Sequence, residues 1–324
     1  MKRIALSLLI TIGIIFVLFT QISIQDLYHL LINVNPYWAV WGSIAYLLAI
    51  LLRALRFRWL IHSREILFSD LFNITVFYHL SLMVLPSKLG ELSYPYFLNK
   101  RSGMSLTEGL ASLIASRVYD FFIVLIIFLF AIIGFQYILQ INLPLTILLF
   151  ILLILAILFA FSHMSAFLVW ISSLVGKMSG WAKFKNNKTL HWVQRKINDM
   201  AEDFYAIKAR KTHFSVSLVS LGAWIMIFYA FYAFLRVFGV DVSLSKVVFG
   251  SMIAVIANAL PISGLGNWGT LEAGWAAGFL MVGLSKEEAI ATGFGVHILI
   301  FLLCGIMALI GWVFFNLSGQ RQKQ

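Results

Sequence analysis

The sequence predicts an all-α polytopic membrane protein with six transmembrane helices and two re-entrant helical hairpins in an inverted repeat. The first observation is composition: of 324 residues, 61% are hydrophobic and only 11% are charged, whereas soluble domains carry about 25% charged residues. The second is a pair of apolar stretches that are each interrupted by proline, glycine and a glutamate. The third is that the two stretches match each other in sequence and have opposite predicted orientations in the membrane. We therefore expect one integral membrane domain over 1–324, without a large soluble part.

Six apolar segments are long enough to cross a hydrocarbon core of about 30 Å. They are 4–22, 37–56, 105–134, 142–162, 213–236 and 285–315. The first lacks the short core and the cleavage site of a signal peptide, so we expect a retained helix. After it, 24–35 is predicted to be a short interfacial helix ended by Pro36. Ser105 and Ser285 each begin a helix, because a glutamate follows three residues later in the pattern of a capping box.

The net charge of +11 is placed as membrane topology requires, and it does not indicate a nucleic-acid partner. Lysine and arginine concentrate in cytoplasmic segments of membrane proteins. The arginines after the second span are assigned to that side: Arg53, Arg56, Arg58 and Arg64. All but five of the 24 basic residues fall in such segments or within a turn of them; the five are Lys88, Arg117, Arg236, Lys246 and Lys286. We expect a multi-pass protein of the cell (inner or cytoplasmic) membrane with both termini in the cytoplasm.

The segment 163–212 is rich in lysine and arginine and is expected to lie in the cytoplasm. Within it, apolar residues recur every three or four positions and form one helical face: Leu190, Val193, Ile197, Met200, Phe204 and Ile207. This pattern predicts a basic amphipathic helix on the inner leaflet. The alternative is a contact surface for a second copy of the chain, so a homo-oligomer stays open.

Two apolar stretches contain residues that a straight membrane helix does not need. They are Leu85-Pro-Ser-Lys-Leu-Gly-Glu91 and Leu260-Pro-Ile-Ser-Gly-Leu-Gly-Asn-Trp-Gly-Thr-Leu-Glu272. Irregular backbone persists inside a membrane only where it is buried in protein or lines a cavity. The stretch 68–100 begins and ends in the cytoplasm but is too short for two crossings of about 20 residues each, which predicts a re-entrant hairpin. The stretch 247–283 would form the matching hairpin from outside; two short, tilted spans per break are the alternative.

The two halves align beyond the hairpins, as repeat one (about 68–134) and repeat two (about 247–315). The matched positions are Pro86 and Pro261, Glu91 and Glu272, Gly103 and Gly283, Ser105 and Ser285, and Glu108 and Glu288. Nine residues after the last two stand Arg117 and His297. Because the halves have opposite predicted topology, the pattern is typical of inverted-repeat transporters, whose substrate site lies at the repeat interface near the bilayer midplane.

Polar residues at membrane depth are functional candidates by default. The predicted translocation site comprises Lys88, Glu91, Arg117, Asp120, Asn258, Gly264, Gly266, Gly269, Glu272 and His297. Arg117 and Lys88 are expected to contact a phosphate; the alternatives are an Arg117–Asp120 pair and a lysine that reaches the membrane surface. The two glutamates exchange protons or bind a cationic group, or else form salt bridges or helix caps. His297 belongs to the site or is a satisfied core residue, whereas His79 is expected to be structural.

The three glycines of the second break spell G-x-G-x-x-G, the fingerprint of dinucleotide-binding folds. That fold needs a preceding strand and a soluble βαβ unit, which the sequence lacks. The glycines are therefore expected to form a tight turn, whose N–H groups either open a half-helix toward a phosphate or serve the turn alone. Asn258 lines the cavity or satisfies the broken backbone. No metal-ligand spacing, nucleophile elbow or Cys–His pair occurs, so we expect no metal, no cofactor and no enzymatic activity.

Taken together, the first break, Arg117-Val-Tyr-Asp120 and the second break resemble the flippase-like family. This is the transmembrane region of lysylphosphatidylglycerol synthase, the multiple peptide resistance factor, and the resemblance covers most of the chain. It implies a lipid-translocating domain in a bacterial or archaeal cell membrane. It also implies that synthase activity belongs to a separate soluble C-terminal domain, so we expect no lipid aminoacylation from a chain that ends after its last helix. Tyr94 and His297 stand where the family often has arginine.

The sequence thus predicts a flippase-like transporter that moves an amphipathic, anionic lipid between leaflets. The candidate substrates are a phospholipid and a polyprenyl-phosphate carrier, and proton coupling is a further expectation. Two other classes stay open: a membrane accessory subunit that contacts an enzyme of a lipid or glycan pathway, and a small-ion transporter or channel.

Overall fold

The computed structural model describes residues 12–13, 16, 20, 34–63, 66–86, 88–139, 141–179, 187–259 and 266–321. Within these ranges every regular element is a helix, so the predicted all-α class is confirmed for them. In chain order the elements are α3 (Pro36–Leu60), α4 (Phe68–Val84), the 3₁₀ helix η1 (Leu89–Leu92), α5 (Ser93–Ser102), α6 (Leu106–Leu139), α7 (Leu143–Ser179), α8 (Lys188–Ala209), α9 (His213–Val237), α10 (Leu244–Ala259), α11 (Thr270–Met281) and α12 (Lys286–Arg321).

Five helices, α3, α6, α7, α9 and α12, are long and apolar enough to cross a membrane. They coincide with five of the six predicted spans. The remaining span, 4–22, and the interfacial helix at 24–35 fall largely outside the described residues. The predicted end of the fourth span at residue 162 is wrong, since α7 continues to Ser179. The physical reason is that the sequence stays largely apolar as far as Lys177, with no proline to end the helix.

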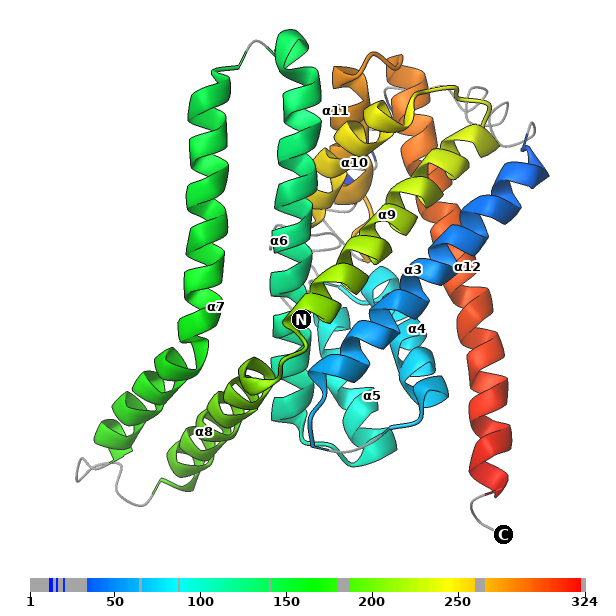
Figure 1. Cartoon of the computed structure of the whole chain (residues 1–324). Helices are drawn as coiled ribbons and strands as arrows, with labels where there is room; N and C mark the ends of the chain where they lie inside the picture. The colour runs from blue at the N-terminus through cyan, green and yellow to red at the C-terminus, as the bar shows by residue number, and fades with distance from the viewer. Residues whose placement is uncertain are drawn as a thin grey trace.

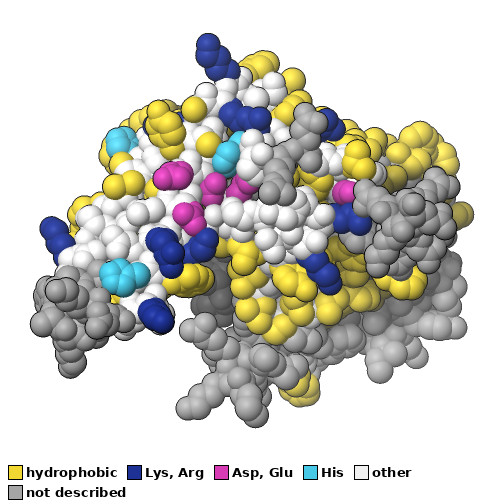
Figure 2. Space-filling model, turned by 90° about the horizontal axis from the view of Figure 1, so that it is seen from below, with side chains coloured by type: hydrophobic (Ala, Val, Ile, Leu, Met, Phe, Trp, Pro, Cys, Tyr) yellow, Lys and Arg dark blue, Asp and Glu magenta, His cyan; other side chains and the backbone are white. Residues whose placement is uncertain are grey.

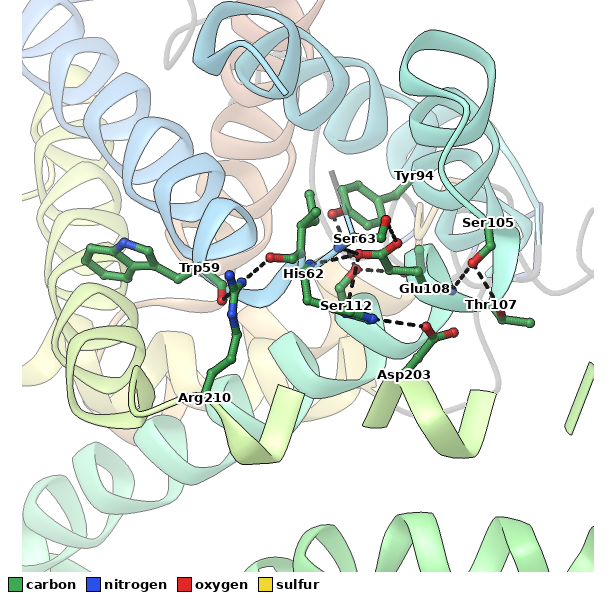
Figure 3. A network of polar contacts seen from close by, with 12 residues as sticks. Trp59, His62, Ser63, Tyr94, Ser105, Thr107, Glu108, Ser112, Asp203 and Arg210 are labelled. Atoms are coloured by element: carbon green, nitrogen blue, oxygen red, sulfur yellow. Dashed lines mark hydrogen bonds and ion pairs between the residues drawn. The ribbon is translucent and has the colours of Figure 1, made fainter. Parts of the chain in front are cut away.

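Both predicted capping residues stand directly before a helix. At α12 the reciprocal box is complete: Ser285 Oγ accepts the N–H of Glu288 at 3.2 Å, and Glu288 accepts the N–H of Ser285 at 3.1 Å. At α6, Ser105 Oγ accepts the N–H of Glu108 at 3.0 Å. The Glu108 carboxylate turns instead to the end of α3 and accepts the N–H of His62 at 2.8 Å (Figure 3). The Glu108 side chain therefore links α6 to the end of α3 and does not cap its own helix.

Helix α8 carries the predicted amphipathic face, and its C-terminal half packs on the protein itself. Phe204 and Ile207 are buried with Ala111 of α6, and Phe161 of α7 packs against them. Asp203 on the same helix lies 3.4 Å from His62 Nε2 at the end of α3 (Figure 3). Contact within the chain thus occupies this half of the face, in place of the inner-leaflet or dimer contact expected from the sequence.

The end of the molecule that carries α5 and α8 is polar. Figure 2 views this end and shows Lys, Arg, Asp, Glu and His side chains gathered on it, with hydrophobic side chains around its sides. A polar end with apolar flanks is the surface that a membrane protein presents along the bilayer normal.

The two predicted breaks separate short helices. Helix α4 has 17 residues and α10 has 16, so at 1.5 Å per residue each is about 25 Å long. Each falls short of the roughly 30 Å hydrocarbon core. In Figure 1, α4 and α5 lie in the lower half of the molecule and α10 and α11 in the upper half.

The two breaks meet, although they are far apart in the sequence. The N–H of Gly266 donates to the carbonyl of Leu85 at 3.3 Å, and the Lys88 amine donates to the carbonyl of Asn258. Gly266 has φ +57°, and a Cβ there would lie 1.9 Å from the carbonyl oxygen of Met83. Only glycine permits this approach, so the local sequence of the second break is adapted to contact with the first.

Candidate functional site

A cavity of about 960 Å³ lies where the two breaks meet the long helices. Its polar lining includes Tyr46, Arg53, Arg56, Tyr78, His79, Lys88, Glu91, Ser116, Arg117, Asp120, Asn258, Asn267 and His297. Six of the residues predicted for the site are thus brought together on its wall: Lys88, Glu91, Arg117, Asp120, Asn258 and His297. Glu272 is fully buried and contacts His297, whereas Gly264 lies outside the described residues.

Arg117 pairs with the glutamate of the first break. Its Nη2 lies 3.3 Å from Glu91 Oε1 and donates to the Tyr78 hydroxyl at 2.6 Å. The side chains of Arg117 and Glu91 remain 36% and 32% exposed, so both are accessible from the cavity. The Arg117–Asp120 pair considered from the sequence is not the one that forms, because Asp120 turns toward α3.

Asp120 pairs with Arg56 in a buried, bidentate arrangement. Arg56 Nη1 and Nη2 donate to its two carboxylate oxygens at 2.6 and 3.1 Å, and Trp224 Nε1 donates to the same carboxylate at 2.9 Å. Arg56 is only 2% exposed, so it lies inside the protein, which its assignment to a cytoplasmic basic cluster did not predict. A usable signal was present: Arg56 stands three residues after Arg53 and seven after Ala49, so these residues share one face of the helix.

Arg53 has neutral partners. Its Nη1 lies 2.7 Å from His79 Nε2, and His79 Nδ1 lies 2.8 Å from the carbonyl of Thr75. Because the carbonyl is an acceptor, Nδ1 carries the proton, and Nε2 accepts from Arg53. His79 is therefore held as a neutral imidazole that also lines the cavity. Arg53 was another member of the basic cluster expected from the sequence, and its place in the cavity wall was not predicted.

The described cavity wall carries an excess of positive charge. Four side chains are cationic (Arg53, Arg56, Lys88 and Arg117) and two are carboxylates (Glu91 and Asp120). The carboxylates pair with Arg117 and Arg56, so Arg53 and Lys88 have only uncharged partners. In addition, the Nε atoms of Arg53, Arg56 and Arg117 are buried without a hydrogen-bond partner in the protein.

The second break holds a buried carboxylate–imidazole pair beside the cavity. His297 Nδ1 lies 2.5 Å from Glu272 Oε1, and their side chains are 3% and 0% exposed. The N–H of Gly269 donates to Glu272 Oε2 at 2.7 Å. The Trp268 ring stacks on the imidazole with centroids 4.1 Å apart. The N–H groups of Gly269 and Gly266 are thus already bonded within the protein, so they are not free to hold the phosphate expected from the sequence.

Comparable pairs occur at matched positions of the two halves. Glu91 contacts Arg117, and Glu272 contacts His297; in each case the base stands nine residues after the glutamate that follows a capping serine. The sequence alignment placed these residues in register without indicating that they touch. Among the described residues, no group of three or more His, Cys, Asp or Glu side chains is arranged to hold a metal ion.

A second polar cluster lies away from the cavity, where α3, α6 and α8 meet (Figure 3). Glu108, His62 and Asp203 form it, and Arg210 donates to the carbonyls of Trp59 and of Ile61 at the end of α3. Burial raises the pKa of Asp203. These contacts fasten α8 to the end of the bundle, which is a structural role.

Comparison with known proteins gives a family assignment. A family model described as "Lysylphosphatidylglycerol synthase TM region" matches residues 4–308. No curated protein and no solved structure matches the chain.

Proposed function

We propose a function from one premise: the chain belongs to the family of lysylphosphatidylglycerol synthase transmembrane regions. It is a flippase-like protein that moves an amphipathic, anionic lipid, a phospholipid or a polyprenyl-phosphate carrier, between the leaflets of the cell membrane. It does so without enzymatic activity of its own. Its headgroup site is the cavity where the two breaks meet.

The excess of cationic side chains in the cavity carries this proposal. Charged groups at membrane depth are expensive unless they are paired or hydrated, yet Arg53 and Lys88 have only neutral partners. A lipid phosphate would supply the missing charge, and guanidinium groups bind phosphate oxygens with favourable geometry. A cationic headgroup would be repelled from the same site.

The apolar part of the wall suits the lipid tails. Phe121, Leu125 and Phe128 of α6 and Leu153 and Ile157 of α7 line the cavity on one side. The most apolar window of α7 is not buried within the described structure, which leaves this helix free to face lipid. The headgroup would then lie among the arginines while the acyl or prenyl chains pass between α6 and α7.

The architecture that we propose for transport is an inverted repeat with six spans, the first at 4–22. Its hairpins enter from opposite sides and meet at Gly266 and Leu85. The opposite placement of α4–α5 and α10–α11 (Figure 1) and the matched glutamate–base pairs support it. In transporters of this kind the site opens to each side in turn by movement of one repeat against the other. Both termini would lie in the cytoplasm.

The test is a leaflet-resolved assay in reconstituted vesicles that contain fluorescent phosphatidylglycerol. A membrane-impermeant quencher reports the lipid that reaches the outer leaflet. We expect the wild type to move it and Arg53→Gln combined with Lys88→Gln to slow it at least tenfold, since a bond to a charged group contributes about 1.5–3 kcal/mol. Arg58→Gln is the matched control, because Arg58 lies on the same helix but is exposed and outside this cavity.

Two other outcomes would point to the alternative classes. Ion leakage without lipid movement would favour a small-ion channel or transporter. Neither leakage nor lipid movement, with phosphatidylglycerol and with a polyprenyl phosphate alike, would favour an accessory subunit that acts through an enzyme of the pathway. The cation excess in the cavity favours neither of these over lipid transport.

A further inference from the structure

The matched pairs of the two halves differ in one chemical property. Arginine remains protonated at every physiological pH, so the Arg117–Glu91 pair has a fixed charge. Histidine is the side chain whose charge changes between about pH 5 and 8. The His297–Glu272 pair therefore makes the same kind of contact as its counterpart, with a residue type whose charge is not fixed.

The surroundings of His297 favour both protonation states. In the neutral state Nδ1–H donates to Glu272, whose other oxygen is held by the N–H of Gly269. In the protonated state the carboxylate at 2.5 Å is a direct counter-ion, and the stacked Trp268 ring attracts a cation. Burial strengthens the attraction between the two groups, because the local dielectric constant is low, and it penalises a charge that has no partner.

The helices packed against His297 add few other ionisable side chains to the cavity wall. Helix α12 packs against α4, α9 and α11; of these, only α4 adds ionisable side chains to the cavity wall, Tyr78 and His79. His79 has both ring nitrogens engaged, by Thr75 and Arg53, so protonation would require Arg53 to move. The other charged groups facing the cavity are Arg53, Arg56, Lys88, Glu91, Arg117 and Asp120. The part of the second break outside the described residues, 260–265, has no ionisable side chain in its sequence.

We propose that the His297–Glu272 pair is a proton-binding site whose occupancy controls the affinity of the cavity for an anionic headgroup. The proposal rests on the lipid-binding function proposed above. With neutral His297, four cationic side chains face three carboxylates, Glu272 included, and the net charge is +1. With protonated His297 the net charge is +2. The proton therefore favours the anion, and one proton travels with each lipid that carries one negative charge.

The size of the coupling follows from electrostatics. One elementary charge at about 10 Å, at an effective dielectric constant of about 20, changes anion affinity about tenfold. Coupling between two ligands is reciprocal. Binding of the anionic lipid must therefore strengthen proton binding by the same factor, so lipid binding takes up protons from solution.

The first experiment measures binding of phosphatidylglycerol to the wild-type protein in detergent by titration calorimetry. A phosphodiester stays ionised between about pH 5.5 and 8.5, so any pH dependence comes from the protein. We expect affinity to fall about tenfold as the pH rises through this range. Repeating the titration in buffers of different ionisation enthalpy counts the protons taken up. Binding without proton uptake at any pH in this range would overturn the proposal, and this result needs no variant.

Two variants then assign the effect to His297. His297→Arg copies the pairing of the first half, so phosphatidylglycerol binding should be tight at every pH and take up no proton. His297→Gln should bind weakly at every pH. Circular dichroism and thermal unfolding in detergent establish that each variant is folded. If either folded variant kept the pH dependence and the proton uptake of the wild type, the site would lie elsewhere.

The last experiment separates this inference from the function on which it rests. Vesicles with reconstituted protein and an imposed pH gradient should move fluorescent phosphatidylglycerol faster than vesicles without a gradient, and His297→Arg should make the rate of movement independent of the gradient. Lipid movement that ignores the gradient in the wild type would refute the proton site and leave the flippase function standing. Proton-coupled binding without any lipid movement would refute the flippase function and leave the proton site standing.

Discussion

Replacing Arg56 with methionine tests the charge arrangement of the cavity most directly. The residue is 2% exposed, and two of its nitrogens bond the carboxylate of Asp120. Methionine keeps much of the apolar volume but leaves Asp120 as a buried charge with only Trp224 as donor. Removing one partner of a buried ion pair costs about 3–5 kcal/mol, and we expect a loss of that size in the free energy of unfolding.

The second half of the test is a double-mutant cycle. Asp120→Asn alone should also destabilise the protein, because it leaves the Arg56 charge without a counter-ion. Combined with Arg56→Met it should restore most of the stability, since replacement of a whole buried pair is often neutral. The expected coupling energy is at least about 2 kcal/mol. Chemical unfolding in mixed micelles, followed by tryptophan fluorescence, measures all four proteins.

Two comparisons decide the interpretation. Arg58→Met, an exposed arginine of the same helix, should change stability by no more than about 0.5 kcal/mol. Arg117→Met should cost less than Arg56→Met, because Arg117 is 36% exposed and its partner Glu91 is also accessible. If Asp120→Asn rescued the Arg117 variant and not the Arg56 variant, the pairing described here would be incorrect.

Four further predictions follow from other parts of the molecule. Single cysteines at Ser102 and Ser285, in a protein without its native cysteine, should react with an impermeant reagent from opposite sides of the membrane. Gly266→Ala should destabilise the contact of the two breaks by about 1–3 kcal/mol in thermal unfolding, because φ is +57° and the added methyl group would overlap a carbonyl. Glu91→Gln removes a negative charge from the cavity and should tighten phosphatidylglycerol binding several-fold. Since burial raises the pKa of Asp203, the folded state binds its proton more tightly, so stability should fall as the pH rises from the ordinary to the raised pKa; Asp203→Asn should remove that slope.

Each of these has a result that contradicts it. Labelling from one side would exclude the inverted repeat. For Gly266 the control is Gly305→Ala, since nothing lies within 4 Å of a Cβ there, and equal stability of both variants would mean that the breaks do not meet as described. Weaker binding in the Glu91 variant would place the anion away from that carboxylate. An unchanged pH slope in the Asp203 variant would assign the slope to another group.

Elements with a one-dimensional pattern could be predicted from the sequence. The spans, the breaks and the capping residue Ser285 all follow from hydrophobicity and from local spacing. The matched positions of Glu91 and Glu272 were found for the same reason. The pattern does not indicate which residues pair between different helices. Asp120 has Arg117 one turn away on its own helix, but it bonds Arg56, which comes 64 residues earlier.

The burial of Arg53 and Arg56 shows why the contacts between helices could not be predicted from the sequence. The positive-inside rule counts basic residues near segment ends. Arg53 and Arg56 stand within the last three turns of α3, and the rule does not say whether such residues are buried. Their burial depends on α4, α6 and α9 closing around that end, since His79, Asp120 and Ser220 come from those helices. The backbone N–H of Gly269 was expected either to face a phosphate or to serve the turn alone, and its bond to the side chain of Glu272, three residues later, realises the capping alternative.

The contact between the two breaks has a consequence for how fast the protein can change shape. It consists of a backbone bond from Gly266 to Leu85 and of the Lys88 contact with the carbonyl of Asn258. Neutral hydrogen bonds contribute about 0.5–1.5 kcal/mol each and those of a charged group about 1.5–3. Parting the two tips therefore requires a few kcal/mol, which thermal fluctuations supply within microseconds to milliseconds. The contact between the two breaks is therefore weak enough to open and close repeatedly. A phosphate that bound the Lys88 amine in place of the Asn258 carbonyl would remove the larger part of the free energy of this contact.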